Sequence, residues 1–227
     1  MNKHAAAVEV SKLEFRIKAK RLLQDVGFRV DRGESFAVVG HNGAGKTTLF
    51  QLILGIKFPN QGEIKIHGIN NLDSSARGAL GYLPERPYLD PEVRFKSHLR
   101  LHLDLIGYPR DGFAEEVDRV SKEVGLSENL SQRFKTFSKG MLQKAMLATA
   151  LLGDPALLIL DEPMSGLDPE SRERMKERFA NWKKLGKTLI FSSHAFEDVH
   201  EFADRVLELK SGRILFLGEP SSWRPEA

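Results

Sequence analysis

The residues with the clearest chemical potential form a glycine-rich run that ends in a lysine and two threonines. Its pattern is G-x-x-x-x-G-K-[ST], in which glycines let the backbone fold tightly around an anion. Amide groups at the start of a helix point at such an anion, and the helix dipole favours negative charge there. We therefore predict a cradle for the phosphates of a nucleoside triphosphate, formed by Gly40, His41, Asn42, Gly43, Ala44, Gly45, Lys46, Thr47 and Thr48.

Two side chains of this run have specific predicted roles. Lys46 is expected to reach the terminal phosphates and to take part in catalysis, and Thr47 to coordinate magnesium. The alternative is a glycine-rich turn that matches the pattern by chance. Against it, an apolar stretch precedes the run, and residues at helix spacing follow it and are expected to bury one helix face, namely Leu49, Leu52, Ile53 and Ile56.

Two adjacent carboxylates follow the apolar run at residues 157–160. In an open α/β sheet, ligands bind beyond the carboxyl ends of the strands. We expect Asp161 to face the magnesium ion, and Glu162 to orient or deprotonate a water in line with the terminal phosphate. Because many strands end in an acidic turn, this pair alone is a weak signal for a catalytic site. Together with the phosphate loop it becomes a strong one.

A histidine, His194, follows another apolar strand at residues 189–191. A lone histidine at a strand end is usually a loop residue or a capped core residue. Here the third strand end directed to the same edge favours a catalytic phosphate contact, because a ring N–H can stabilise charge on the transferring group. Ser138 and Gly140 open an amphipathic helix, with Ser138 in the cap position.

The surrounding pattern predicts an α/β fold. Alternation at residues 8–10, 28–30 and 63–66 indicates half-buried strands in a small antiparallel layer. The continuously apolar segments that precede the phosphate loop, Asp161 and His194 are typical of parallel strands covered by helices on both faces. The segments 205–209 and 213–217 predict a hairpin.

Helical patterns complete the organisation. Asp168 is the expected cap of a helix that begins at Pro169 and ends at Gly186. Neither a linker nor an internal repeat divides the chain. We therefore predict one domain over residues 1–227, with the core and β layer at about 1–83 and 153–227 and a helical subdomain at about 84–152.

Composition narrows the classes of function. The chain has 227 residues, of which 41% are hydrophobic and 29% charged, as in globular proteins, and it has no cysteine for disulfide or thiol chemistry. Because no apolar run approaches the ~18 residues of a membrane span, a membrane role would need a span from another chain. Interspersed charges with a net +3 argue against nucleic-acid binding, and residues 1–7 lack the apolar core of a secretion signal.

The motifs and their order resemble the ATP-binding subunit of ABC transporters over nearly the whole chain. In chain order they are the phosphate loop, a loop at residues 81–85, a signature at 137–143, Asp161 and Glu162, residues 165–168, and His194. The resemblance implies a P-loop NTPase core with a mostly parallel sheet, a small antiparallel β layer and a helical subdomain. It also implies ATP and Mg²⁺ as cofactors.

The resemblance further implies a second copy of the chain, bound head to tail. Ser138 and the amide of Gly140 would contact the terminal phosphate of a nucleotide held by the other copy. The family signature usually reads Leu-Ser-Gly-Gly-Gln, whereas this chain has Phe137, Lys139 and Met141 at the first, third and fifth positions. The two residues that carry the phosphate contacts are retained.

Two other positions depart from the family pattern or are not clearly placed. The loop at 81–85 usually presents a glutamine, and Glu85 stands there instead. Its carboxylate could bind magnesium or a water, yet it would repel the γ-phosphate. For the aromatic residue that stacks on adenine in relatives, Phe15 is the nearest candidate, and it could equally be a strand residue in the core.

The expected function is ATP hydrolysis that drives transport through a separate integral-membrane permease, on the cytoplasmic face of the cell membrane. Glu85 and the Ser-Lys-Gly-Met form of the signature resemble the subgroup of exporters, and this resemblance implies export as the direction of transport. One alternative is a soluble ABC-type ATPase in DNA repair, chromosome organisation or translation, whose relatives carry a long coiled coil or two tandem cassettes. Another is a small-molecule kinase, which would need an acceptor pocket.

Overall fold

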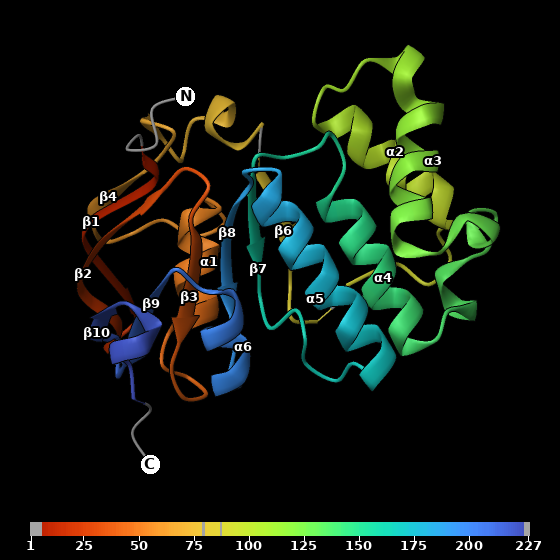
Figure 1. The fold of residues 1–227 in the computed structure, drawn as a ribbon. Coiled ribbons are helices and arrows are strands. Elements are labelled where there is room, and N and C mark those ends of the chain that lie inside the picture. The colour runs from red at the N-terminus through yellow and green to blue at the C-terminus, as the bar shows by residue number, and fades with distance from the viewer. Residues whose placement is uncertain (1–5, 79, 87, 225–227) are drawn as a thin grey trace.

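The computed structural model describes residues 6–78, 80–86 and 88–224, which form two β-sheets with α-helices packed around the larger sheet (Figure 1). Most of the segment 1–7, in which a secretion signal is not expected, lies outside this part of the chain, as do the last three residues of the predicted domain. Among the described residues, no helix combines the length and the hydropathy that crossing a lipid bilayer requires.

The smaller sheet is antiparallel, as the alternating segments predict. Its strand order is β2-β1-β4-β5. Along β1, Val8, Val10 and Leu13 are buried while Glu9 is only partly covered, so one face of the sheet packs on the core. The strands are β1 (Ala6–Ile17), β2 (Lys20–Asp31), β4 (Gln61–Ile66) and β5 (Ile69–Asn70).

The larger sheet has the order β10-β9-β3-β8-β7-β6. Neighbours from β9 to β6 pair in parallel, and β10 pairs antiparallel with β9 to close the predicted hairpin. This confirms the expected α/β core with a mostly parallel sheet. The strands are β3 (Ser35–Val39), β6 (Leu80–Leu83), β7 (Leu157–Leu160), β8 (Thr188–Ser192), β9 (Arg205–Lys210) and β10 (Arg213–Gly218).

The prediction of a loop at residues 81–85 is wrong for its first three residues. They lie in β6, which pairs in parallel with β7. Gly81 suggests a turn in the sequence, but here it allows close packing, because a Cβ at this position would lie 1.9 Å from the carbonyl oxygen of Ala150. The strand therefore needs glycine where α4 crosses it.

The helices form two groups (Figure 1). Helices α1 (Lys46–Ile53), α5 (Pro169–Lys184) and α6 (Phe196–Phe202) lie around the larger sheet, whereas α2 (Phe95–Leu105), α3 (Phe113–Val124) and α4 (Lys139–Ala150) lie together on one side of it. Helix α5 begins at the predicted cap, Asp168, and Gly186 follows its end with φ of 74°. Single 3₁₀ turns lie at Ser74–Arg77, Arg110–Gly112, Ser127–Asn129, Phe134–Thr136 and Pro220–Ser222.

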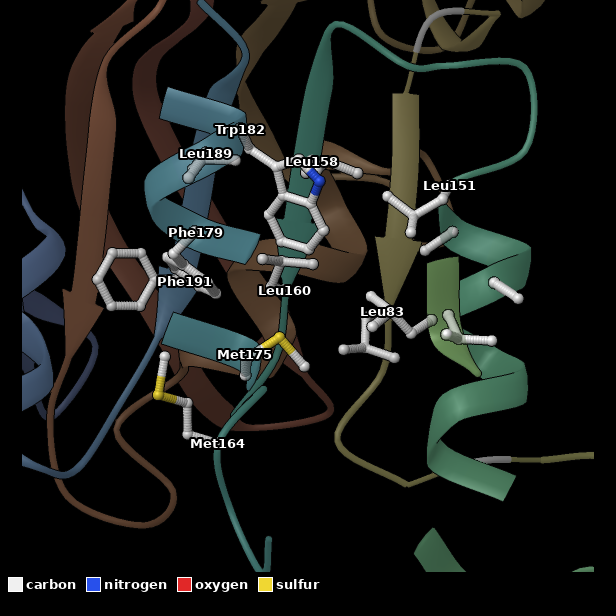
Figure 2. Packing of buried hydrophobic residues seen from close by; sticks show 14 of the residues in the cluster. Leu83, Leu151, Leu158, Leu160, Met164, Met175, Phe179, Trp182, Leu189 and Phe191 are labelled. Atoms are coloured by element: carbon white, nitrogen blue, oxygen red, sulfur yellow. The ribbon is translucent and has the colours of Figure 1, made fainter. Parts of the chain in front are cut away.

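Both faces of the larger sheet are covered. Alternate residues of β3 point to opposite faces, so that Phe36 and Val38 join a cluster with α1, while Ala37 and Val39 join the cluster beneath α5. Figure 2 shows the second cluster, in which α5 faces β7 and β8 through Met175, Phe179 and Trp182, and these pack near Leu158, Leu160, Leu189 and Phe191. Close packing on both faces therefore makes the larger sheet rigid, and the strand ends are held in fixed positions.

Helix α1 is shorter than its apolar pattern predicts. Leu49, Leu52 and Ile53 are buried as expected, but Ile56 is 60% exposed. The helix ends at Ile53, and Gly55 follows with φ of 69°, a left-handed conformation that commonly terminates helices. The chain therefore turns away before Ile56 can reach the buried face.

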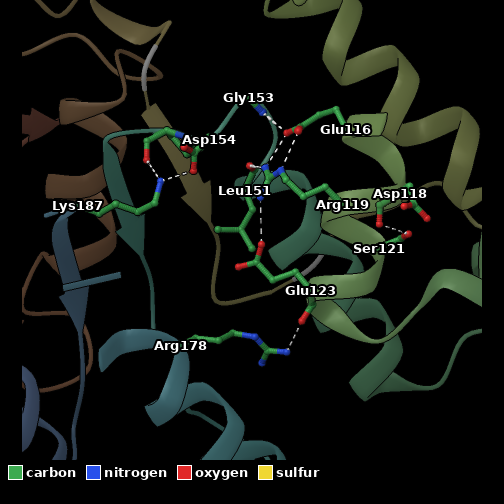
Figure 3. A network of polar contacts seen from close by, with 11 residues as sticks. Glu116, Asp118, Arg119, Ser121, Glu123, Leu151, Gly153, Asp154, Arg178 and Lys187 are labelled. Atoms are coloured by element: carbon green, nitrogen blue, oxygen red, sulfur yellow. Dashed lines mark hydrogen bonds and ion pairs between the residues drawn. The ribbon is translucent and has the colours of Figure 1, made fainter. Parts of the chain in front are cut away.

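Polar contacts join α3 to the rest of the molecule (Figure 3). The buried carboxylate of Glu116 accepts hydrogen bonds from Arg119 and from the amide of Gly153, each at 2.7 Å. On the neighbouring side, Arg178 of α5 donates to the carbonyl oxygen of Glu123 at 2.8 Å. These contacts tie the helical group to the turn after α4 and to α5, while the predicted boundaries of a helical subdomain near residues 84 and 152 remain a prediction.

Candidate functional site

Four parallel strands end at one edge of the larger sheet, and each is followed by a residue to which the sequence assigns a role. β3 leads into the phosphate loop at residues 40–48, β6 is followed by Glu85, β7 by Asp161, and β8 by His194. Because these strands are neighbours with parallel pairing, their carboxyl ends meet at that edge. The fold therefore gathers groups that are widely separated in the sequence.

Glycines give the phosphate loop its tight course. Gly40 has φ of 145°, and a Cβ there would lie 2.3 Å from the carbonyl oxygen of Leu209 in β9. Gly45, with φ of 116°, is the N-cap of α1, and a Cβ would lie 2.9 Å from the side chain of Leu23. Since Gly45 has no side chain to cap the helix, the first amides of α1 are available to an anion.

Side chains of the loop contact the neighbouring strand ends. The Nζ atom of Lys46 donates to the carbonyl oxygen of Gly40 at 2.8 Å and lies 3.2 Å from Nε2 of His194. The hydroxyl of Thr47 donates to Oδ2 of Asp161 at 2.8 Å. The residues with predicted phosphate and magnesium roles therefore lie within one connected set of contacts.

Ser192, which the sequence analysis did not single out, connects the two carboxylates. Its hydroxyl donates to Oδ1 of Asp161 and accepts a hydrogen bond from the amide of Glu162, both at 2.7 Å. Ser192 is the last residue of β8 and is fully buried. The available signal was a polar residue at the end of a continuously apolar strand.

Glu162 has a strained and shielded position. Its φ is 51°, a left-handed conformation that is uncommon outside glycine and often found at functional sites. Its Oε1 atom lies 3.1 Å from Nε2 of His194 and 3.8 Å from Nζ of Lys46. Neither contact has hydrogen-bond geometry, so among the described residues this buried oxygen has no hydrogen-bond donor.

Burial shifts the proton affinities of the carboxylates. It raises the pKa of Glu162 to about 7, with Asp161 and Glu85 adding to the rise and Lys46 opposing it. Burial also raises the pKa of Asp161, against the hydrogen bonds from Ser192 and Thr47. The site therefore holds one carboxylate with the affinity of a general base at neutral pH.

The pKa values of the two basic side chains, Lys46 and His194, are shifted downwards. Burial lowers the pKa of Lys46, although Glu162 and Asp161 favour its charged form. Burial and the charge of Lys46 lower the pKa of His194, which favours a neutral imidazole. A neutral ring can both donate and accept a hydrogen bond.

A hollow of about 420 Å³ lies over these groups. Besides the phosphate-loop residues 41–48, its walls include Asp161, Glu162, His194 and Glu85. The sequence analysis did not assign Lys20, Leu22 or Ser165 a place in a binding site, and they complete the lining.

Four predicted site residues do not line this hollow: Gly40, which begins the phosphate loop, and Phe15, Ser138 and Gly140. Phe15 is paired with Leu23 across β1 and β2, is partly buried and packs against the core. Ser138 caps α4, where its hydroxyl accepts from the amide of Met141 at 3.3 Å. Ser138 and Gly140 are exposed, and none of the residues that the structure describes lies within 4 Å of a Cβ built on Gly140. That surface is free to approach another molecule.

The groups available to a metal ion are few. Among the described residues, no three His, Asp or Glu side chains are grouped as a metal site. Thr47 and Asp161 supply two adjacent oxygens. This donor set fits Mg²⁺, which proteins usually bind through one or two side chains together with substrate phosphates and water.

Comparisons with known proteins agree with this geometry. A family model described as ABC transporter matches residues 23–165, more than half of the chain. The molybdate/tungstate import ATP-binding protein WtpC of Thermococcus kodakarensis is 36% identical over 199 residues, covering 86% of this chain and 60% of that protein. The Nod factor export ATP-binding protein I of Rhizobium etli is 32% identical over 216 residues, covering 94% and 68%.

A solved structure of the ATP binding subunit of an ABC transporter has the same fold. Its TM-score is 0.86 at 35% sequence identity, with 94% of this chain and 90% of that chain covered. The chain spans 60% and 68% of the lengths of the two curated relatives named above.

Proposed function

The chain belongs to the ABC transporter family of ATP-binding domains, and we propose that it hydrolyses ATP to drive transport through a permease on a separate chain. The observation that supports this is the meeting of Lys46, Thr47, Asp161, Glu162 and His194 at one sheet edge. A binding module without catalysis would not need a shielded carboxylate with a pKa of about 7 beside the phosphate loop.

ATP is held in this proposal by the phosphate loop. The amides at the start of α1 bind phosphate oxygens, and Lys46 moves its ammonium from the carbonyl of Gly40 to the terminal phosphates. Thr47 and Asp161 hold Mg²⁺, and Glu85, on the wall of the same hollow, contributes a further oxygen. The ion, when bound, neutralises the charge that develops on the phosphates.

Glu162 then acts on the attacking water. Its buried Oε1 lacks a hydrogen-bond donor among the described residues, so it can accept a proton or orient the water. His194, 3.1 Å away, stabilises charge on the transferring group through its ring N–H. Ser192 and the strained backbone of Glu162 fix the direction of the carboxylate.

A second copy of the chain completes each site. Ser138 and Gly140 lie outside the hollow of their own copy and are exposed, which supports their delivery to the nucleotide of a partner copy. The first amides of α4 then meet the terminal phosphate, as at other helix starts. The result is a head-to-tail pair with twofold symmetry, in which ATP holds two surfaces together.

The permease supplies the membrane span and keeps this chain on the cytoplasmic face of the cell membrane. The named relatives include an import and an export protein, so they do not distinguish the two directions. Export is the proposed direction on the basis of Glu85 and the Ser-Lys-Gly-Met form of the signature. The alternative of a soluble ATPase in DNA repair or translation has less support, because the longest described helix, α5, has only 16 residues and forms no long coiled coil.

The proposal is tested by measuring ATP hydrolysis by the purified chain over a wide range of protein concentrations. A site shared by two copies predicts that specific activity rises with protein concentration until the pair is saturated. Full activity per chain at the lowest concentration would contradict the shared site, and no hydrolysis in the presence of Mg²⁺ at any concentration, with or without the permease, would contradict the enzyme.

A further inference from the structure

Helix α6 begins two residues after His194, and a buried carboxylate joins it to α5. Asp198, in the first turn of α6, is 2% exposed and accepts a hydrogen bond from the guanidinium of Arg172. Its other oxygen accepts from the hydroxyl of Ser193 at 3.2 Å. The same hydroxyl accepts from the amide of Ala195 at 3.1 Å. The contacts therefore hold the backbone on both sides of His194.

The carboxylate has a specific counter-ion on the neighbouring helix. Arg172 lies in the first turns of α5, and its amide donates to the carbonyl of Asp168, the cap of that helix, at 2.9 Å. Asp198 is nearly inaccessible to solvent, whereas the Arg172 side chain is 34% exposed. A charge-assisted bond from an arginine to a buried carboxylate fixes the geometry of both groups more firmly than a surface ion pair.

Among the described residues, the imidazole of His194 has few polar contacts of its own. Its ring is 47% exposed, and its described polar contacts are those to Lys46 and Glu162. Both partners belong to the nucleotide site and are expected to turn towards phosphate and water. Contacts that persist during the reaction must therefore come from the backbone of residues 193–195, which Asp198 anchors.

We propose that Asp198, paired with Arg172, is a positioning residue that acts through Ser193 to hold the imidazole of His194 in place. This inference rests on the proposed role of His194 in ATP hydrolysis. Asp198 does not touch the hollow, so its effect is on the rate of the chemical step and not on the binding of ATP.

The test is the substitution Asp198→Asn, followed by steady-state ATP hydrolysis. An amide offers one acceptor oxygen where the carboxylate offers two, so either Arg172 or Ser193 loses its acceptor. The expected result is a kcat lowered about 10- to 100-fold with a KM for ATP that changes less than about threefold, as for other positioning contacts of a site.

The matched control is Glu201→Gln. Glu201 pairs with Lys176 at 2.9 Å, which joins the same two helices farther along both, at a more exposed place. We expect a kcat within about twofold of wild type, because exposed ion pairs contribute little. An equal loss in both variants would mean that any loosening between α5 and α6 lowers the rate, and would overturn the specific role of Asp198.

Dependence on the imidazole separates positioning from general structural damage. In a His194→Ala background, Asp198→Asn should lower the single-turnover rate by no more than about twofold. The same factor in both backgrounds, or an unchanged kcat in the single variant, would overturn the proposal. Should Asp198→Asn not fold by circular dichroism, Ser193→Ala removes the same link, and wild-type kcat in that variant would also overturn it.

These outcomes remain distinct from a failure of the proposed function. If His194→Ala hydrolyses ATP as fast as wild type, the assigned role of His194 is wrong whatever Asp198 does. If wild type does not hydrolyse ATP, the proposed function fails before any variant is compared.

Discussion

The carboxylate of Glu162 lies against the ammonium of Lys46, with 3.8 Å between Oε1 and Nζ and both side chains largely shielded from solvent. Burial alone would push both groups towards their neutral forms, and each charge partly restores the other. A change in one group therefore alters the protonation of the other. Phosphate that draws Lys46 away would leave Glu162 a better base.

Glu162→Gln should leave ATP binding intact and nearly abolish turnover. Glutamine keeps the shape of the side chain but cannot accept a proton from water, and a general base contributes roughly 10²–10⁴-fold to the rate. Because the nucleotide then persists, an ATP-bound dimer should accumulate. Size-exclusion chromatography with and without ATP measures the dimer, and hydrolysis at the wild-type rate would refute the role of Glu162.

Lys46→Ala should weaken ATP binding by about 10- to 100-fold. The substitution removes the charged donor that we propose for the terminal phosphates, and a hydrogen bond to a charged group contributes about 1.5–3 kcal/mol. Isothermal titration calorimetry measures the change. Lys65→Ala, in the antiparallel sheet and outside the hollow, is the control for general loss of positive charge. Equal affinities of Lys46→Ala and wild type would contradict the phosphate contact.

Glu85→Gln should weaken the apparent affinity for Mg²⁺ severalfold. An amide oxygen is a poorer magnesium ligand than a carboxylate. The substitution also removes a negative charge from the wall of the hollow, where the γ-phosphate is proposed to bind. The dependence of ATP hydrolysis on Mg²⁺ at saturating ATP measures this. Tighter ATP binding with an unchanged requirement for Mg²⁺ would show that Glu85 acts only by repulsion and is not a metal ligand.

Much of the fold follows from local patterns in the sequence. Apolar runs of β3, β7 and β8 predict buried parallel strands, and a glycine-rich segment between a strand and a helix predicts an anion cradle. Because parallel strands direct their carboxyl ends to one edge, three strand ends with polar residues also predict a shared site. The reaction roles of those residues remain predictions.

Other features depend on register and packing that the sequence pattern does not contain. The β1–β2 pairing has irregularities on both sides of Phe15, and in this hairpin Lys20 and Leu22 line the hollow while Phe15 does not. Gly81 reflects contact with α4, a partner far along the chain. The contact between Arg172 and Asp198 likewise depends on the packing of α5 against α6.

The free energy of unfolding should fall in mild acid. Burial, and to a lesser extent His102, lowers the pKa of His98 to about 4, whereas an unfolded histidine has a pKa of about 6.5. Between these values the unfolded chain binds a proton that the folded chain excludes. Stability should therefore decrease as pH falls from about 6.5 to about 4, by about 1–3 kcal/mol, and then level off with respect to this group.

His98→Gln isolates this contribution. Glutamine can keep the contact between His98 and the hydroxyl of Thr149, which is 3.1 Å long, but does not titrate. Urea unfolding at pH 7 and pH 4.5 should give a smaller difference for this variant than for wild type. His200→Gln, at an exposed histidine, is the control. Equal pH dependence of His98→Gln and wild type would exclude His98 as the source.

Ser192→Ala should lower kcat more than its effect on stability alone would suggest. Its hydroxyl joins Asp161 to the amide of Glu162, so its loss frees both the proposed metal ligand and the proposed base. Loss of a residue that hydrogen-bonds a metal ligand typically lowers metal affinity or activity 10- to 100-fold. The two unsatisfied buried groups should also cost about 1–3 kcal/mol of unfolding free energy.

Ser35→Ala is the matched control for this experiment. Ser35 also lies in the parallel sheet and is buried, but among the described residues its hydroxyl has no hydrogen-bond partner. Removing it should leave both kcat and stability unchanged or slightly raise stability, because no contact is lost and a buried polar group disappears. If both serine variants lose activity equally, the defect lies in core packing; a loss confined to Ser192→Ala locates it at the carboxylates.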